Sequence, residues 1–180
     1  MAISKIGTNS IDTSAVTQPK VASGVAGSGP AFSAYNNATQ SINASTATIV
    51  QLQVKEFDTA TCFNNTSGTV TLNGLSVPAW SFCPNVAGYY QISASVQMLL
   101  GSQGQSGEVY INKNGGVALY GNFAAADNNA YVSANASQLL YLNGTGDYIS
   151  MSAWQSSGAA RNIQAGGAQT RLGAVLVRSA

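Results

Sequence analysis

The sequence is poor in charge and contains no histidine. Its 180 residues include only 7 Lys or Arg and 6 Asp or Glu, which gives a formal net charge of +1. The basic residues are scattered along the chain, whereas nucleic-acid binding requires clustered Lys and Arg that displace counterions. Without histidine there is no Ser–His or Cys–His nucleophile pair and no imidazole ligand for a metal. These absences argue against nucleic-acid binding and against the commonest hydrolytic mechanisms.

The acidic residues form no catalytic pattern. Glu56 and Asp58 share one face of a predicted strand, and Asp147 completes a predicted turn. Folding can still bring two carboxylates together as in a glycosidase, but we predict that the protein is not an enzyme and binds no cofactor. Asp127 with Asn128 and Asn129 offers oxygen ligands of the kind that calcium prefers. A loop with one acid is more often only a loop, so no metal site is predicted.

Long apolar runs and helical periodicity are also missing. No run approaches the roughly 20 residues of a membrane span, and the first ten residues lack the apolar centre of a secretory signal. The two cysteines, Cys62 and Cys83, flank a hairpin-like insertion. They are compatible with a disulfide, which geometry decides, or with two small buried side chains. So few charged residues are typical of a protein that is part of an assembly, because surface charge is what keeps soluble monomers from associating.

Short β-strands separated by turn residues are what the sequence does contain. Asn73-Gly74 and Asn114-Gly115 lie between apolar residues and predict tight hairpins. No stretch keeps a helical period. We therefore predict an all-β antiparallel sandwich or jelly roll. The expected strands cover 30–35, 46–58, 69–77 as two short pieces, 88–96, 108–116, 117–123, 131–142 with a break in the middle, 148–154 and 170–178; the segments 36–45, 124–130 and 155–169 are expected loops.

The stretch Ser81 to Val96 is the clearest local signal. Pro84 belongs at a strand edge or end because it cannot donate to a central ladder. Gly88 is expected to make a turn through its backbone freedom. After it, Tyr90, Ile92, Ala94 and Val96 alternate and are expected to face one way.

Residues 1–29 read differently from the domain at 30–180. Apolar residues are spaced among Ser, Thr, Asn and Gly, and residues 22–30 have the composition of a flexible linker. One interpretation is a disordered tail. We favour an arm that becomes ordered on a partner through its apolar residues Ile3, Ile6, Ile11 and Val16.

The landmarks of residues 30–178, taken in order, resemble the globular head of complement component 1q and its tumour-necrosis-factor relatives. The matching runs are P-A-F-S-A-Y (30–35), F-C-P-N-V-A-G-Y-Y (82–90), V-Y-I-N-K-N-G (109–115), L-L-Y-L-N-G-T-G-D-Y-I-S-M (139–151) and T-R-L-G-A-V-L-V (170–177). The chain departs from that family in its 64–80 insertion, in the aromatic residue missing from its last strand and in the absence of a collagen repeat. The resemblance implies a homotrimeric jelly roll. Candidates for the trimer interface are Tyr90, Tyr110, Tyr141, Tyr148 and Trp154, each of which also fits plain core.

The start of the chain, M-A-I-S-K-I-G-T-N-S-I followed by A-V-T at 15–17, is similar to the lead of many bacteriophage virion proteins that carry a comparable jelly roll. That resemblance implies a phage particle, after synthesis in the host cytoplasm. Our first hypothesis is a trimeric capsid decoration (cement) protein on the head surface, tied by the arm to the major capsid protein or another virion protein. The alternative is a tail-fibre tip that recognises host surface glycan, with Trp154, Tyr120 and Tyr131 stacking on sugars. The missing signal argues against a third hypothesis, a secreted ligand.

Overall fold

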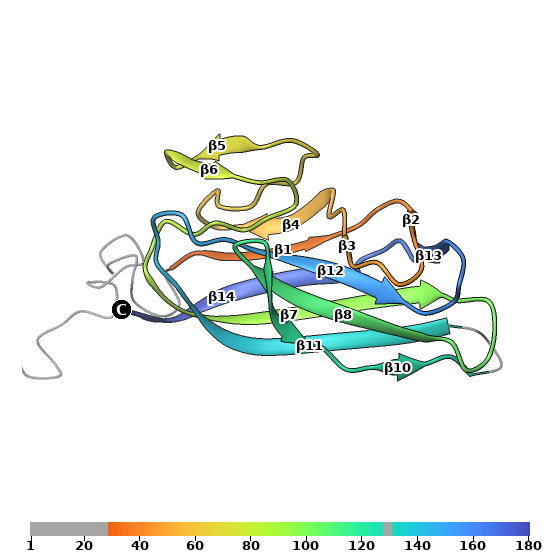
Figure 1. Ribbon diagram of the computed structural model, residues 1–180. Helices are drawn as coiled ribbons and strands as arrows, with labels where there is room; N and C mark the ends of the chain where they lie inside the picture. Colours follow the sequence, from red (N-terminus) through yellow and green to blue (C-terminus); the bar gives the residue numbers. More distant parts are fainter. Residues whose placement is uncertain (1–28, 128–130) are drawn as a thin grey trace, which may run out of the picture.

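The computed structural model describes residues 29–127 and 131–180, which fold into two facing antiparallel sheets and contain no helix (Figure 1). In that part of the chain, therefore, no helix is long and apolar enough to cross a membrane. The strands are β1 (Ala31–Tyr35), β2 (Gln40–Ile42), β3 (Thr48–Ile49), β4 (Val54–Asp58), β5 (Val70–Leu72), β6 (Leu75–Val77), β7 (Gly88–Leu99), β8 (Ser106–Lys113), β9 (Gly116–Tyr120), β10 (Ala124–Ala125), β11 (Tyr131–Leu142), β12 (Ile149–Gln155), β13 (Arg161–Ile163) and β14 (Arg171–Ser179).

The first sheet has the order β2-β13-β7-β14-β1-β4, and β11 pairs with the remaining edge of β7. The second sheet has the order β10-β8-β12-β3, with β9 beside β8. The core lies between them, where apolar residues from β7, β11 and β14 meet residues from β8 and β12. The predicted all-β antiparallel jelly roll is confirmed.

Strands β7 and β11 are the longest, and they show why the sequence folds this way. Tyr90, Ile92, Ala94 and Val96 are buried, as the alternation predicts, while the residues between them face outward. In β11 the buried residues are Val132, Ala134, Ala136 and Leu142, and the polar residues between the first three lie on the outer face. The predicted break in 131–142 is therefore wrong, because those polar residues fit an alternating pattern and pair along the whole of β7.

The stretch Ser81–Val96 brings one strand of each sheet together through aromatic packing. The Phe82 ring stacks on Phe32 with centroids 4.4 Å apart, and Phe32 stacks on Phe63 at 4.7 Å. Tyr90 meets the edge of Phe82 at 5.9 Å, and its hydroxyl donates to the carbonyl of Val86 at 2.8 Å. This cluster fixes the distance between the sheets at the end of the sandwich where β7 begins.

Gly88 is needed for space rather than for a turn. It is the first residue of β7 and has no positive φ. A Cβ at this position would lie 2.4 Å from the carbonyl oxygen of Arg178 and 2.6 Å from Leu176 Cδ1. The predicted turn at Gly88 is wrong, and the physical reason for glycine is the close approach of β14.

The predicted strand 46–58 is two strands in different sheets. β3 pairs with β12 in the second sheet, whereas β4 pairs with β1 in the first. The residues between cross from one sheet to the other, and Val50 and Leu52 are fully buried on the way. All three segments expected to be loops also hold short strands: β2 in 36–45 and β13 in 155–169 pair with each other, and β10 in 124–130 pairs with β8.

The 64–80 insertion forms the small β5–β6 hairpin, which stands clear of the two sheets in Figure 1. Its turn has φ of 50° at Asn73 and 76° at Gly74, the left-handed pair that favours Asn-Gly. The buried Asn64 ties the insertion together: its amide nitrogen lies 2.7–3.0 Å from the carbonyls of Gly68, Val77 and Pro78, and its oxygen accepts from Thr66.

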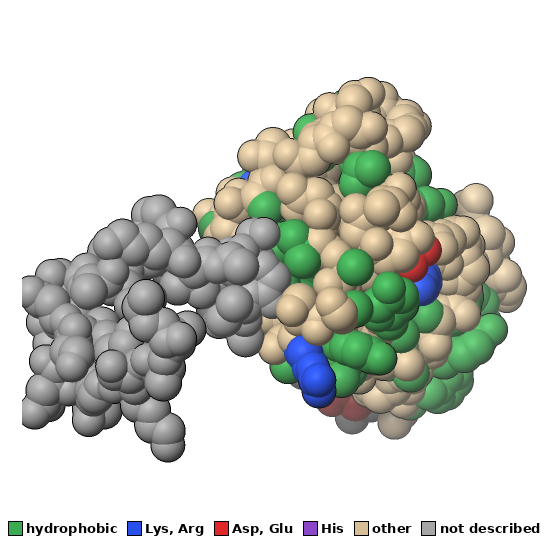
Figure 2. Space-filling model, turned by 90° about the vertical axis from the view of Figure 1, so that its left-hand side faces the viewer, with side chains coloured by type: hydrophobic (Ala, Val, Ile, Leu, Met, Phe, Trp, Pro, Cys, Tyr) green, Lys and Arg blue, Asp and Glu red, His purple; other side chains and the backbone are tan. Residues whose placement is uncertain are grey.

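Both ends of the domain lie at the same end of the sandwich. β1 begins and β14 ends there, because the two strands are antiparallel neighbours with Ala31 opposite Val175. Figure 2 looks onto this end and shows isolated charged side chains among polar and apolar ones. The opposite end carries the loops after β7, β12 and β13. We call the two ends the terminal end and the loop end.

Candidate interaction surface

The side of the first sheet that points away from the core carries most of the exposed large hydrophobic side chains in the described part of the chain. We call it the outer face. Eleven large hydrophobic side chains are exposed in the part of the chain that the structure describes. Seven of them lie on the outer face, where β4, β14, β7 and β11 present them: Phe57, Tyr89, Tyr131, Leu139, Tyr141, Val175 and Val177.

The apolar side chains gather toward the terminal end. Tyr89 on β7 lies directly opposite Tyr141 on β11, and their rings are 5.6 Å apart. Two residues further along, Leu139 and Val175 flank Gln91 on either side. Leu139 is 51% exposed and Val175 45% exposed. Side chains of this size remain half in water only where nothing in the domain itself covers them.

The middle of the outer face is polar and hollowed. Ser93, Ser95 and Ser137 carry small side chains, and Gly173 has none, so shallow depressions of about 430–460 Å³ form between the larger neighbours. The polar groups are partly paired within the face: Gln91 Nε2 donates to Ser137 Oγ at 2.8 Å.

One ion pair stands beside these depressions. Arg171 Nη2 lies 2.8 Å from Glu56 Oε2, and Ser33 Oγ donates to the same oxygen at 2.6 Å. Arg171 also donates to Ser33 Oγ at 3.0 Å. Both charged side chains are more than a third exposed, so the pair adds little stability to the isolated domain. The ion pair fixes the orientation of the Arg171 guanidinium, which lines both depressions.

The predicted interface residues are not brought together. Tyr141 lies on the outer face. Tyr90 is enclosed in the core, where it cannot reach another subunit, and burial raises the pKa of its hydroxyl. The neighbouring residue Tyr89, rather than Tyr90, is exposed on the outer face. Tyr148 is half-buried near the Asn114–Gly115 turn, and Tyr110 and Trp154 belong to the second sheet.

Sequence reasoning missed most of the outer face. Tyr89 and Val175 alternate with buried residues on their strands, and Leu139 alternates with the half-buried Gln138 and Leu140. The signal that identifies them is an apolar residue on the polar side of an alternating strand. That signal becomes visible only when the register places the three strands side by side.

A second aromatic cluster lies on the second sheet and its edge. Tyr120 and Phe123 are each 64% exposed. Tyr120 meets Tyr110 edge-on at 4.9 Å, and Phe123 lies 6.4 Å from Trp154. Burial, with the nearby Glu108 carboxylate, raises the pKa of Tyr110 to about 12. We call this group the edge cluster.

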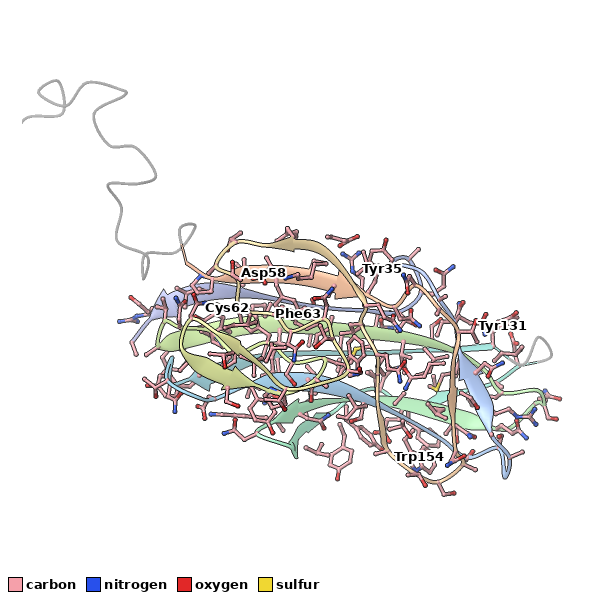
Figure 3. All side chains as sticks on the ribbon, turned by 90° about the horizontal axis from the view of Figure 1, so that it is seen from above. Tyr35, Asp58, Cys62, Phe63, Tyr131 and Trp154 are labelled. Carbon is pink, nitrogen blue, oxygen red and sulfur yellow. The ribbon has the colours of Figure 1, made fainter. Side chains whose placement is uncertain are left out.

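The three residues expected to stack on sugars do not converge. Trp154 and Tyr120 belong to the edge cluster, whereas Tyr131 lies on the outer face of the other sheet (Figure 3). Tyr131 is instead part of a polar cleft at the loop end, lined also by Gln97, Asp127, Gln164, Ala165 and Gln169.

The cysteines are buried free thiols. The backbone N–H of Cys83 donates to the carbonyl of Cys62 at 2.9 Å, so the two residues are paired across neighbouring segments (Figure 3 labels Cys62). Burial raises the pKa of the Cys62 thiol to about 11. No group of three or more Cys, Asp or Glu side chains within residues 29–127 and 131–180 is placed to hold a metal ion. The predicted arm residues Ile3, Ile6, Ile11 and Val16 lie outside the described residues.

Comparison with known proteins supports this architecture. The globular domain of zebrafish complement 1qA matches with a TM-score of 0.57 at 16% identity, over 84% of this chain and 98% of that one. The chain has the complement 1q and tumour-necrosis-factor jelly-roll fold. Eiger TNF from S. frugiperda matches with a TM-score of 0.56 at 12% identity, over 83% of this chain and 93% of that one.

Murine APRIL matches with a TM-score of 0.54 at 15% identity, over 82% of this chain and 98% of that one. No family model and no curated protein sequence matches the chain. At these identities the similarity establishes the fold.

Proposed function

We propose that the protein is a homotrimeric structural component of a bacteriophage particle, most simply a decoration protein of the capsid. In this proposal the outer face of each of three copies packs against the edge of its neighbour, and residues 1–29 tie the trimer to the shell. The observation that carries it is the concentration of exposed apolar side chains on the outer face.

The size of that patch supports association. Fully burying a large apolar side chain contributes about 1.5–3 kcal/mol, so covering the exposed half of each of the six that lie outside the loop-end cleft contributes about 1 kcal/mol per side chain. The sum is of the same order as the roughly 4–15 kcal/mol that association costs in lost freedom. The remaining contribution must come from a second surface on each protomer.

The edge cluster supplies such a second surface. A ring of identical subunits requires two different complementary patches on each copy, since each contact is head to tail. The outer face is broad and hollowed, whereas Tyr120 and Phe123 project from the edge of the domain. Insertion of these two side chains into the neighbour's outer face satisfies both patches at once, and closure after three copies is what the resemblance to complement component 1q implies.

Placement in a virion rests on the sequence of the arm and on the low charge. The lead M-A-I-S-K-I-G-T-N-S-I is similar to that of phage virion proteins, and 13 charged residues (7 basic and 6 acidic) in 180 suit an assembled state. In a ring with three-fold symmetry the terminal ends of all protomers point the same way. Three arms then start from one side of the trimer, and their combined attachment is far tighter than that of one arm.

The role of the arm is tested by deleting residues 1–29. The binding of the truncated protein is then measured on purified particles of the phage that encodes it, prepared without this protein. We expect the truncated chain to remain folded and trimeric by sedimentation velocity but to be absent from the particles. Full occupancy by the truncated chain contradicts the role of the arm. A monomeric full-length chain at micromolar concentration contradicts the trimer.

A tail-fibre tip is the second candidate, and one observation favours it. The polar cleft around Tyr131 lies at the loop end, away from the end where the arm joins the domain. A trimer anchored by its arms would therefore present three such clefts outward. Imaging of labelled particles separates the candidates, because a decoration protein is found in many copies on the head and a fibre tip in few copies on the tail.

A further inference from the structure

We infer that the polar cleft at the loop end is a binding site for a neutral saccharide. The cleft has a volume of about 450 Å³, which lies within the roughly 300–1,000 Å³ of small-molecule sites. Its lining combines one aromatic ring, one carboxylate and three side-chain amides: Tyr131, Asp127, Gln97, Gln164 and Gln169. This inference deepens the tail-tip candidate but requires neither that location nor the trimer.

The floor of the cleft is built on two paired strands. Tyr131 begins β11 and Gln97 lies near the end of β7, where Gln97 is opposite Ser133. The two side chains are therefore diagonal neighbours on the same face of the sheet, a spacing that allows both to contact one ligand. Gln97 Nε2 also donates to Ser133 Oγ at 3.4 Å, which orients its amide along the sheet.

The wall of the cleft is the segment between β13 and β14, and it is held rigidly. The backbone N–H of Gln164 donates to the carbonyl of Gln97 at 2.8 Å. The fully buried Thr170 donates from its hydroxyl to the carbonyl of Gln164 at 2.8 Å. A tight turn, with N–H bonds from Gln169 and Thr170 to the carbonyl of Gly166, closes the segment. Because the wall is fixed by the backbone, a ligand does not have to order it.

The chemistry of the lining selects the ligand class. Each glutamine amide both donates and accepts, as do the hydroxyls of a sugar, and a carboxylate accepts from hydroxyl pairs. Tyr131 is 46% exposed and offers an apolar ring to the C–H face of a pyranose. No Lys or Arg lines the cleft, so it offers no cationic partner to an anionic sugar. Neutral sugars are therefore favoured over sialylated, sulfated or phosphorylated ones.

The cleft is separate from the apolar part of the outer face. Gln97 lies eight residues beyond Tyr89 on β7, which is about 26 Å along the strand. Changes near Tyr89, Leu139 or Tyr141 therefore alter association without touching the cleft. Binding at the cleft and trimer formation can fail independently.

The inference is tested on the full-length protein by saturation-transfer NMR with lactose, maltotriose and triacetylchitotriose, each up to about 10 mM, since a small open site is expected to bind with millimolar affinity. The matched anionic probe is 3′-sialyllactose. We expect at least one neutral sugar to bind and 3′-sialyllactose to bind at least 10-fold more weakly than lactose.

Variants locate the site. Tyr131→Ala and Gln164→Ala are expected to weaken binding at least 10-fold. Val117→Ala truncates a similarly exposed apolar side chain (42% exposed, against 46% for Tyr131) outside the cleft and outside the proposed trimer contacts, and it serves as the control, with unchanged binding. Leu139→Asp, which tests the trimer, is expected to leave binding per protomer unchanged.

Three results overturn the inference: no neutral sugar binds, binding survives Tyr131→Ala, or binding requires added calcium and disappears with chelator. The last result identifies a cation site in the same cleft. Sedimentation of the same samples reports the oligomeric state, so failure of the sugar site and failure of the trimer are read separately.

Discussion

Replacement of Leu139 by Asp tests whether the outer face is an interface. Leu139 is 51% exposed in the single chain, so covering its exposed half contributes about 1 kcal/mol. An aspartate at the same place puts an unpaired carboxylate into the contact, which costs several kcal/mol. The two effects together weaken each contact between subunits by about 4 kcal/mol, or roughly 10³-fold in Kd.

The assay is sedimentation velocity of wild type and variant from about 1 to 100 µM, a range in which a 10³-fold change in Kd is resolved. We expect wild type to sediment as a trimer and Leu139→Asp as a monomer. Thr71→Asp adds the same charge at an exposed position of the β5–β6 hairpin and is expected to remain trimeric. Because Leu139 faces solvent in the monomer, both variants should keep the wild-type circular dichroism spectrum. A folded Leu139→Asp that stays fully trimeric refutes the assignment of the interface to this face.

Three further predictions concern the stability of the domain. Gly88→Ala forces a Cβ to within 2.4 Å of a backbone oxygen of β14 and is expected to lower the free energy of unfolding by about 1–3 kcal/mol. The control is Gly116→Ala, whose Cβ would meet nothing closer than 3.7 Å and which is expected to change the free energy of unfolding little. Equal urea midpoints for the two variants would contradict the close approach of β14 as the reason for glycine at position 88. Asn64→Ala is expected to cost about 2–3 kcal/mol because it leaves buried carbonyls of the insertion without a donor, and the exposed Asn37→Ala is the control in the same urea titration. Partial burial acts to raise the pKa of Asp147, but hydrogen bonds from Lys113, Asn114 and the Asn143 backbone outweigh it and lower that pKa below 3.8. The stabilisation from the Asp147 carboxylate is therefore present above pH 3.8 and is lost as the pH falls through the pKa of the folded protein. The thermal unfolding temperature of Asp147→Asn should differ from that of wild type at pH 7 and converge with it in acid, and a difference that persists in acid would show that the charge is not responsible.

Several features of the fold were readable from the sequence because they depend on neighbouring residues. The Asn-Gly pairs at 73–74 and 114–115 set their turns through local backbone preference, and both adopt the left-handed geometry. Alternation placed Tyr90, Ile92, Ala94 and Val96 on one face of β7, and that face is the core. The order of these local signals was sufficient for the jelly roll.

Other features depend on which segments pair, and no local signal contains that information. Residues 46–58 read as one strand, yet they cross from one sheet to the other because β12 and β1 offer different edges. β2 and β13 are too short to be recognised alone and exist because they pair with each other. Gly88 looked like a turn residue, and only the approach of β14 shows that it is needed for space.

The same division applies to the surfaces. Low charge and a phage-like lead came from the sequence and set the hypothesis of an assembled protein. Which of Tyr89 and Tyr90 faces outward was decided by the packing of Phe82 and Phe32 against one side of β7. The outer face and the loop-end cleft join residues from strands far apart in the chain, such as Gln97, Tyr131 and Gln164. The sequence determined which residues of each strand point to the same side. The pairing of strands in the folded chain decided which of those residues form a common surface, because the hydrogen-bonded register joins segments that are far apart in the sequence.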